Sequence, residues 1–338
     1  MRHYKRTPEF IEFVKNLQIC FDWNMVSTAL RPTVQDRFGS KAEVIQVKVR
    51  PLNDHVFACR VMISTADKGP HIAWPVVAKT FVRREDLTRS FNLMQMLWEN
   101  GFSYDAEDDI RVAEPLLIAP DINFLFMKVV PGIKLRKFIK RGEDAPTHMR
   151  RFARTLAKLH QCQFVPEREI TLQNQLQKRH REHCQLIETF PDLRESIQFI
   201  VEISQNIADK FRSDIHVPVH MDYNLGHVLI DGERSWLIDY DDIKHGDPAW
   251  DIGKVLTFSV LNNENPEVSN GEELREAFKE EYFSVMDKTI ARRVPLYKAY
   301  YLLSRACKYH RTQDPSRLAK IEDLIKHAVT YVERMKTA

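Results

Sequence analysis

The chain has 338 residues, of which 43% are hydrophobic and 29% are charged. A chain of this length and composition forms a globular protein with a substantial core, which excludes a disordered protein. Its 50 basic residues are nearly balanced by 47 acidic ones, for a net charge of +3, so charge gives no argument for nucleic acid as the main partner.

The cysteines and the apolar runs predict the compartment. Five cysteines are scattered without a CxxC pair, and an odd count fits reduced thiols better than a disulfide framework. No long apolar run follows the basic N-terminus, and none approaches the roughly 20 residues of a membrane span. We therefore expect a soluble, cytoplasmic protein with no membrane partner, whose oligomeric state the sequence leaves unknown.

The first part of the chain predicts a strand-rich lobe. Short helical pieces around residues 10–13 and 34–38 precede three β-branched and aromatic segments separated by turn residues, which is typical of an antiparallel meander. A helix with one apolar face follows, ending before Gly101, and two further strands come next. The predicted strands are 42–49, 55–64, 75–81, 112–118 and 123–129, and the helix is 84–100.

After Pro131 and Gly132 the sequence becomes mainly helical. One strand pair interrupts the helices, and helices resume from about residue 251. The predicted helices are 147–161, 173–187 and 196–211, and the strand pair is 227–230 with 235–238. Strands first and helices later predict an α+β protein with an N-terminal nucleotide-binding lobe (1–127) and a helical C-terminal lobe (128–338) that holds the catalytic loop and acceptor site.

The predicted hairpin gathers chemically useful side chains. Asp222 precedes it, His227 begins its first strand and Asp239 follows it, so the three can converge at one end of the hairpin. Two carboxylates and an imidazole suit one divalent ion and one general base. Phosphoryl transfer needs this combination, because a metal neutralises phosphate oxygens while a carboxylate orients the attacking hydroxyl. The alternative is that Asp222 and Asp239 are ordinary turn carboxylates.

A phosphate donor also needs a cation. Lys79 lies among apolar neighbours in the strand Val76-Val77-Ala78-Lys79, which matches the Val-Ala-Ile-Lys type of strand that contacts ATP phosphates in kinases. Its alternative is a lysine of an amphipathic strand. The segment 125–132 (LFMKVVPG) would connect the lobes and leave backbone groups free to bind an adenine edge.

Four segments, in order, resemble the aminoglycoside phosphotransferase and choline kinase-like family, which has a bilobal protein-kinase-like fold. The segment 220–229 (HMDYNLGHVL) resembles its HGDLxxxN loop, and 237–253 (LIDYDDIKHGDPAWDIG) resembles its IDW…GDPxxDLA segment. The segments 126–135 and 156–160 resemble its hinge and the helix before its insertion. Together with the preceding strands they cover most of residues 42–260.

The resemblance implies roles for individual residues. Asp222 would be the catalytic, hydroxyl-orienting carboxylate, and Asp239 would bind Mg²⁺. Lys79 would contact the ATP phosphates, while the carbonyl of Lys128 and the amide of Val130 would face adenine. His220 and Asp251 would be structural residues that hold the catalytic loop.

The chain departs from the family's pattern at three points. His227 replaces the metal-binding asparagine, so it is either a metal ligand or a hydrogen-bond partner of Asp239 or a phosphate. No glutamate is placed to pair with Lys79, for which Asn92 or Glu85 could substitute. The loop 50–55 between the first two strands has no glycine with which to cradle phosphates.

These features predict an ATP- and Mg²⁺-dependent O-phosphotransferase for a small-molecule acceptor of the aminoglycoside, macrolide or amino-alcohol kind. Asp241 and Asp242 weakly favour a cationic or polyhydroxy acceptor. The main alternative is a kinase-like binding or regulatory protein without transfer activity. A protein kinase fits less well, because no Ala-Pro-Glu segment follows Asp239. The run 178–184 (KRHREHC) reads as a solvated helix face rather than a metal site.

Overall fold

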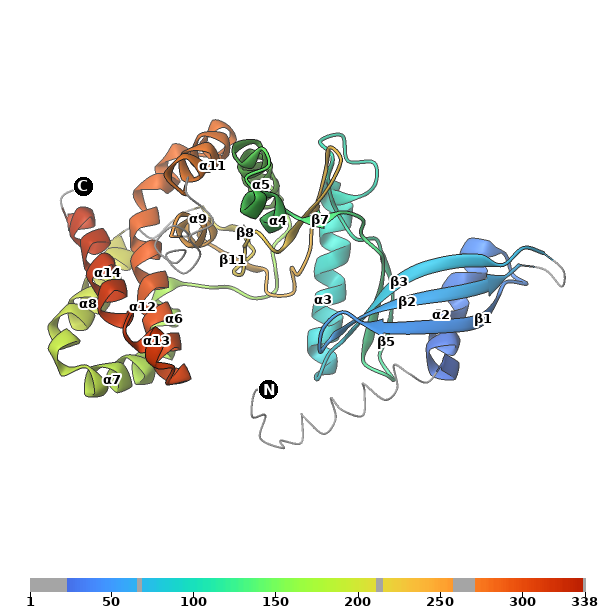
Figure 1. The fold of residues 1–338 in the computed structure, drawn as a ribbon, viewed down its shortest axis with the longest axis horizontal. Coiled ribbons are helices and arrows are strands. Elements are labelled where there is room, and N and C mark those ends of the chain that lie inside the picture. Colours follow the sequence, from blue (N-terminus) through green and yellow to red (C-terminus); the bar gives the residue numbers. More distant parts are fainter. Residues whose placement is uncertain (1–22, 66–68, 211–214, 258–270, 337–338) are drawn as a thin grey trace. The chain divides into compact units, whose positions relative to one another are not determined.

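The computed structural model describes residues 23–65, 69–210, 215–257 and 271–336 (Figure 1). The helical piece predicted around residues 10–13 lies outside these ranges. The chain divides into two compact units, Met1–Ile133 with Leu229–Asp241, and Lys134–Val228 with Asp242–Ala338. The hairpin segment Leu229–Asp241 thus counts with the N-terminal unit, whereas the sequence-based division at residue 127 puts it with the C-terminal lobe.

A five-stranded antiparallel sheet forms the N-terminal unit, with strand order β1-β2-β3-β6-β5. The predicted meander is therefore present. Elements of this unit are α2 (Trp23–Phe38), β1 (Glu43–Pro51), β2 (Val56–Ser64), β3 (Ile72–Thr80), α3 (Arg84–Leu97), the single π-type turn η1 (Trp98–Phe102), β4 (Ile110–Val112), β5 (Pro115–Ala119), β6 (Phe124–Lys128) and β10 (Arg234–Leu237), together with β9 (Val228–Asp231), whose first residue belongs to the other unit.

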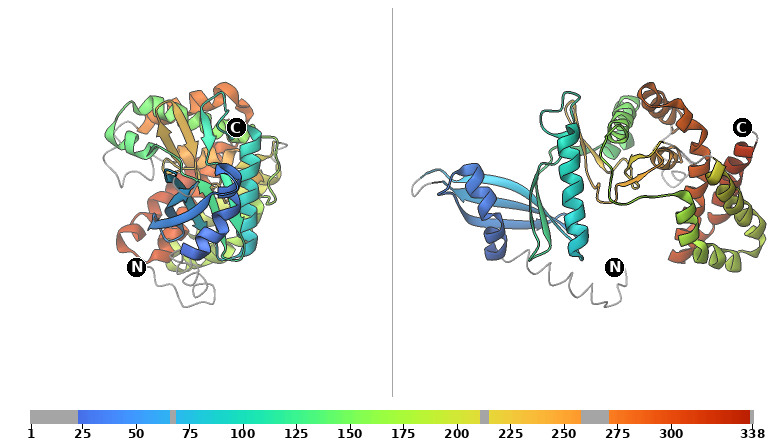
Figure 2. Two further views of the ribbon diagram at one scale, coloured as in Figure 1. Left: turned by 90° about the vertical axis from the view of Figure 1, so that its right-hand side faces the viewer. Right: turned by 180° about the vertical axis from the view of Figure 1, so that it is seen from behind.

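One face of the sheet forms the core of this unit. Alternate residues of β2, beginning with Phe57 and ending with Ile63, are buried, as the period of a strand requires. Helix α2 contributes Val26, Leu30 and Val34, which are four residues apart and so lie along one side of the helix. These residues pack into one cluster with the strands, and α2 lies along the sheet in Figure 2 (right).

The prediction of one continuous strand at 112–118 is wrong. The structure has two short strands there, which belong to different sheets: β4 pairs with β10 in parallel, and β5 pairs with β6. The chain changes direction at Ala113 and Glu114 because Pro115, the first residue of β5, has no N–H for a continuous ladder.

The second unit is mainly helical, as predicted. Its elements are α4 (Leu135–Arg141), α5 (Ala145–His160), α6 (Leu172–Lys178), α7 (His180–Thr189), η2 (Pro191–Leu193), α8 (Arg194–Lys210), β8 (Val217–Val219), β11 (Lys244–Gly246), α9 (Ala249–Leu256), α11 (Gly271–Val285), η4 (Lys288–Arg292), α12 (Val294–Thr312), α13 (Pro315–Leu318) and α14 (Ile321–Lys336), and β7 (Ile133–Lys134) lies at its boundary. The one helix predicted at 173–187 is two helices, α6 and α7, which meet at Arg179.

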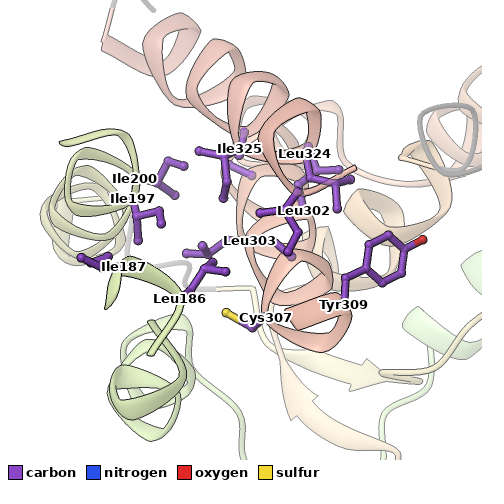
Figure 3. Packing of buried hydrophobic residues seen from close by; sticks show 14 of the residues in the cluster. Leu186, Ile187, Ile197, Ile200, Leu302, Leu303, Cys307, Tyr309, Leu324 and Ile325 are labelled. Atoms are coloured by element: carbon purple, nitrogen blue, oxygen red, sulfur yellow. The ribbon is translucent and has the colours of Figure 1, made fainter. Parts of the chain in front are cut away.

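Helix α12 organises the core of the helical unit. Leu302, Leu303 and Ala306 recur at helical spacing along one face and are completely buried. They pack in one cluster with residues of α7, α8 and α14, and Figure 3 shows Ile197 and Ile325 directed toward this face. Truncating one of these leucines to alanine would cost about 2–5 kcal/mol. The opposite face of α12 does not belong to this cluster.

No helix in the described ranges combines the length and the apolar character that crossing a membrane requires.

Candidate active site

The loop between β8 and β9 is held by a buried carboxylate. Asp251, in the first turn of α9, is almost fully buried, and its two oxygens accept hydrogen bonds from the backbone N–H groups of His220 (2.6 Å) and Met221 (2.9 Å). Bonds from two successive amides fix the local backbone just before Asp222. Asp251 thus occupies the bracing position expected from the sequence.

A second interaction holds Asp251 itself. The Nε2 atom of His160, at the end of α5, lies 3.1 Å from the Asp251 carboxylate, and its Nδ1 atom lies 2.7 Å from the Tyr282 hydroxyl. Burial alone would raise the pKa of Asp251, but the hydrogen bond and charge of His160, together with His220, hold this pKa below its usual value. This role of His160 was not predicted from the sequence, because its partners Asp251 and Tyr282 lie far away in the chain.

Met221 has a left-handed backbone conformation, with φ of 66°. The resembling family motif has glycine at this position, and glycine adopts this conformation without a steric penalty. A methionine there stores roughly 1–2 kcal/mol of local strain. The hydrogen bonds that Asp251 accepts keep the loop in this shape and present Asp222 beyond it.

Asp222 is half exposed and faces a lysine. Its Oδ1 atom is paired with the ammonium group of Lys254, which also lies 3.3 Å from the carbonyl oxygen of Met221. Lys254 lies one turn beyond Asp251 on α9, so one short helix both braces the loop and orients the carboxylate that the loop carries.

His227 closes the same loop. Its Nδ1 atom lies 2.9 Å from the carbonyl oxygen of Asp222 and 3.8 Å from the carboxylate of the same residue. The amide nitrogen of Asn224, which is a donor, lies 3.0 Å from Nδ1 and 3.3 Å from Nε2 of the same ring. The His227 ring is thus held within the loop by both Asp222 and Asn224.

In the N-terminal unit, Lys79 on β3 is paired with two carboxylates. Its ammonium group binds Asp241 and lies 3.2 Å from Asp239, two residues after β10. Burial would lower the pKa of Lys79, but the charges of Asp241 and Asp239 raise it above its ordinary value. The lysine is therefore charged at neutral pH.

Helix α3 interacts with Lys79 indirectly, through Asp241. The hydroxyl of Ser90, buried on α3, donates to the second oxygen of Asp241. Neither of the residues suggested as partners of Lys79 fills that place: Glu85 and Asn92 are both exposed on α3. Asp241 thus stands where a helix glutamate was expected.

Backbone N–H groups of the turn between β1 and β2 form hydrogen bonds within the turn itself. The side-chain oxygen of Asn53 accepts from the N–H groups of His55 and Val56, each at 2.8 Å. The N–H groups of Leu52 and Asn53 donate to the carbonyl of Val56. Four consecutive or near-consecutive donors are thus engaged within the turn, which leaves little with which to cradle a phosphate.

Lys128 and Val130 lie at the end of the N-terminal sheet. Lys128 is the last residue of β6, its N–H donates to the carbonyl of Glu114, and Val130 lies two residues beyond the strand. Of the predicted site residues, Lys79, Lys128, Val130 and Asp239 thus belong to the N-terminal unit, and Asp222 and His227 belong to the helical unit.

A cleft of about 440 Å³ opens beside Asp222 within the helical unit. Its walls come from the loop at Met221 and Asp222, from α9, and from one face of α12. The α12 residues recur at helical spacing on the face opposite the core: Tyr297, Tyr300, Tyr301, Ser304, Arg305, Lys308 and Arg311. This α12 stripe was not predicted from the sequence, although its three-and-four-residue spacing is visible there.

Close approach of α9 to α12 forms one wall of the cleft. A Cβ atom on Gly253 would lie 2.8 Å from the Cβ of Tyr297, closer than real Cβ contacts allow. Glycine at this position lets the helices touch, and it sets Lys254, the next residue, beside the α12 stripe. Asp247 holds the first residue of the stripe in place. Its carboxylate binds Arg293 in a bidentate pair and accepts a hydrogen bond from the Tyr297 hydroxyl at 3.1 Å.

Comparison with known proteins identifies the family. A sequence profile of the Phosphotransferase enzyme family matches residues 64–293, so the chain belongs to this family. Comparison with the sequences of curated proteins found no match.

Several solved structures share the fold. A ternary complex of streptomycin, ATP and APH(2")-IIa has a TM-score of 0.58 and 17% identity, covering 86% of this chain and 94% of that one. A choline/ethanolamine kinase family protein from Mesorhizobium loti has a TM-score of 0.55 and 15% identity, with 86% and 92% covered. An aminoglycoside phosphotransferase from Alicyclobacillus acidocaldarius has a TM-score of 0.55 and 15% identity, with 88% and 94% covered. The α+β, kinase-like fold predicted from the sequence is confirmed.

Proposed function

We propose that this protein transfers the γ-phosphate of ATP to a hydroxyl group of a small molecule, with Asp222 as the catalytic carboxylate. The observation that carries the proposal is the setting of Asp222: its loop is fixed by buried Asp251, and its carboxylate lines a cleft large enough for a small molecule. Membership of the Phosphotransferase enzyme family supports the reaction class.

In this proposal Asp222 accepts the proton of the acceptor hydroxyl as that oxygen attacks the γ-phosphorus. Lys254 holds the carboxylate in one orientation through its ion pair. Holding the reacting groups in place supplies most of the rate, because phosphoryl transfer requires little covalent chemistry from the protein.

The nucleotide would bind through the N-terminal unit. Lys79 is charged and held by Asp239 and Asp241, which suits it to contact phosphate oxygens. The carbonyl of Lys128 and the amide of Val130 would bind the adenine edge. Structures that share the fold include complexes with ATP, ADP and GDP, which supports a purine nucleotide here, and competition between ATP and GTP would decide which of the two is used.

Mg²⁺ would be held by Asp239 and His227, which flank the β9–β10 hairpin on its two sides. A carboxylate is a preferred Mg²⁺ ligand and a histidine nitrogen can bind a divalent ion, so these two residue types fit such an ion. When bound, the ion would neutralise charge on the phosphate oxygens.

The cysteines support the proposed cellular compartment. Of those in the described ranges, Cys59, Cys162, Cys184 and Cys307 are free, and burial raises the pKa of Cys59 and Cys307 to about 12. Inert thiols of this kind are typical of a reducing compartment. These thiols support the proposal that the enzyme acts in the cytoplasm on a soluble acceptor.

A second candidate is a kinase-like binding protein without transfer activity. The β1–β2 turn favours it, since four of its amides bond within the turn rather than being kept for phosphates. The two candidates differ in nucleotide turnover. Absence of Mg-ATP binding, measured by calorimetry, would favour the second.

The proposal is tested by heating the protein with and without Mg-ATP. A ligand that binds only the folded state raises the melting temperature, by an amount equivalent to about 2.7 kcal/mol at a hundred times its Kd. Asp222→Asn should keep this shift and lose turnover. Full turnover in that variant would contradict the role of Asp222.

A further inference from the structure

The cleft beside Asp222 is lined by far more positive than negative charge. Five cations line it, Arg179, Lys254, Arg305, Lys308 and Arg311, against the single carboxylate of Asp222. We infer that the acceptor of this enzyme is an anionic hydroxyl compound, one that carries a carboxylate or phosphate group, and not a cationic amino sugar or amino alcohol. The inference rests on the proposed function, since it names the substrate class of the same site.

Among the described residues, ion pairs compensate only part of this charge. Lys254 is paired with Asp222, and Arg179 and Arg311 share a single carboxylate, Glu182, at 3.0 and 3.3 Å. Arg179, Lys254, Arg305 and Arg311 thus outnumber these two carboxylates by two, without counting Lys308. The neighbouring carboxylate of Asp247 adds nothing to the balance, because Arg293 binds it in a buried bidentate pair.

Three of these cations lie at one end of the α12 stripe. Arg305, Lys308 and Arg311 follow one another at helical spacing, and Lys308 and Arg311 are exposed. The side chains of Arg305 and Lys308 are therefore placed to meet the anionic group of a ligand whose hydroxyl lies at Asp222. Charge-assisted hydrogen bonds to carboxylate or phosphate are the strong ones, and arginine makes them in bidentate form.

The other end of the stripe is aromatic. The rings of Tyr297 and Tyr300 pack on that of Trp250, with centroids 4.8 and 4.9 Å apart, and all three residues line the cleft. All three residues are buried, so they give the cleft an apolar wall of small exposed area that suits an apolar part of the ligand. The acceptor thus has a hydroxyl near Asp222, a ring or carbon skeleton on the aromatic residues, and an anionic group at the basic end.

The sequence-based preference for a cationic acceptor is not supported by the structure. That preference rested on Asp241 and Asp242. Asp241 binds Lys79 and accepts a hydrogen bond from Ser90 within the N-terminal unit, and it is not among the residues that line the cleft. Asp242 is exposed and does not line the cleft.

The reaction balances without another reactant. The acceptor oxygen forms a bond to the γ-phosphorus, and the bond from that phosphorus to the β–γ bridging oxygen breaks. The hydroxyl proton passes to Asp222, and ADP leaves with the electron pair of the broken bond. The anionic group of the acceptor takes no part except in binding.

The test uses matched acceptors that differ chiefly in charge. ADP release by the full-length protein is measured with glucuronate, glucose and glucosamine, and with para-(hydroxymethyl)benzoate, its methyl analogue and para-(hydroxymethyl)benzylamine. The phosphate monoester of glucose is added to distinguish a phosphate from a carboxylate. We expect the anionic member of a set to exceed the cationic member in kcat/KM by about tenfold or more.

Variants locate the preference in the cleft. Arg305→Gln combined with Lys308→Gln should raise KM for the anionic acceptor about tenfold and leave the KM for ATP unchanged. Lys326→Gln is the matched control, since Lys326 is a highly exposed lysine of α14 outside the cleft and should change neither value. Melting temperatures verify that the variants are folded, and Lys308→Gln alone serves if the pair is not.

Preference for the cationic members, or indifference to charge, would overturn the inference while leaving the proposed phosphotransferase intact. If no acceptor is phosphorylated, pyrophosphate is titrated calorimetrically into the protein saturated with ADP. Binding about tenfold weaker in the double variant than in wild type supports the anionic cleft, and equal binding overturns it. Failure of the proposed function is a separate result, because it appears as absence of phosphate transfer or of Mg-ATP binding in wild type, whatever the charge preference of the cleft.

Discussion

The ammonium group of Lys254 binds the carboxylate of Asp222, and both side chains line the same cleft of the helical unit. Lys254→Met should therefore free the Asp222 side chain to rotate, and we expect kcat to fall about tenfold because a misplaced base loses much of its effect. Binding of Mg-ATP, measured by calorimetry, should not change. An unaltered kcat would show that the ion pair has no part in positioning Asp222.

The left-handed backbone at Met221 can be tested by two substitutions compared with each other. Met221→Gly removes both the side chain and the strain, whereas Met221→Ala removes the side chain and keeps a Cβ at φ of 66°. The glycine variant should be more stable toward urea than the alanine variant by about 1 kcal/mol. Equal stability, or a more stable alanine variant, would mean that the loop is not strained.

Asp251 should make the stability of the protein sensitive to acid. Its folded-state pKa lies below its ordinary value, so its contribution is fully present above the ordinary value of about 3.9 and is lost as the pH falls through the lower folded value. Asp251→Asn should lower the free energy of unfolding by about 2 kcal/mol at neutral pH, because a loop amide loses its acceptor.

The control for that variant is the pH dependence itself. Urea unfolding between neutral pH and pH ~3 should have a shallower acid slope in Asp251→Asn than in wild type. A slope identical to that of wild type would exclude a lowered pKa at Asp251.

The network of Lys79 predicts graded effects on nucleotide binding. Lys79→Met should weaken Mg-ATP binding about tenfold or more, since a charged contact to phosphate is lost. Ser90→Ala should have a smaller effect in the same direction, because Ser90 acts only through its hydrogen bond to Asp241. Calorimetric titration measures both. A stronger effect of Ser90→Ala than of Lys79→Met would contradict this order.

His227 is tested by its metal preference. His227→Asn exchanges a nitrogen donor for an oxygen donor, so the ratio of activity with Mn²⁺ to activity with Mg²⁺ should fall, as oxygen ligands favour Mg²⁺. Activity is measured with each ion over a range of concentrations. Identical metal dependence in the two proteins would remove His227 from the metal site.

The fold was predictable because its signals are local. Alternating apolar residues indicate β1 to β3, and the turn residues between them limit the possible connections. The errors arose where a few residues decide the path of the chain. Pro115 divides one predicted strand into β4 and β5, and the chain at Arg179 divides one predicted helix into α6 and α7.

The candidate site was less predictable because its partners lie far apart in the chain. Motif spacing indicates Asp222 and Asp239, but the hydrogen bonds of Asp251 with His160 and of Asp241 with Ser90 join residues 91 and 151 positions apart. Nothing local marks such partners. The α12 stripe is a different case, since its helical spacing is present in the sequence and only the cleft gives it meaning.

The central claim is tested most directly by following the γ-phosphate itself. Radiolabelled ATP is incubated with Mg²⁺, the full-length protein and the acceptor series, and labelled acceptor is separated from inorganic phosphate. We expect acceptor-dependent transfer by wild type. The transfer activity of Asp222→Asn should be lower by about a hundredfold or more, while this variant still binds Mg-ATP. Equal transfer by the two proteins, or no labelled acceptor from a wild-type protein that binds Mg-ATP, would contradict it.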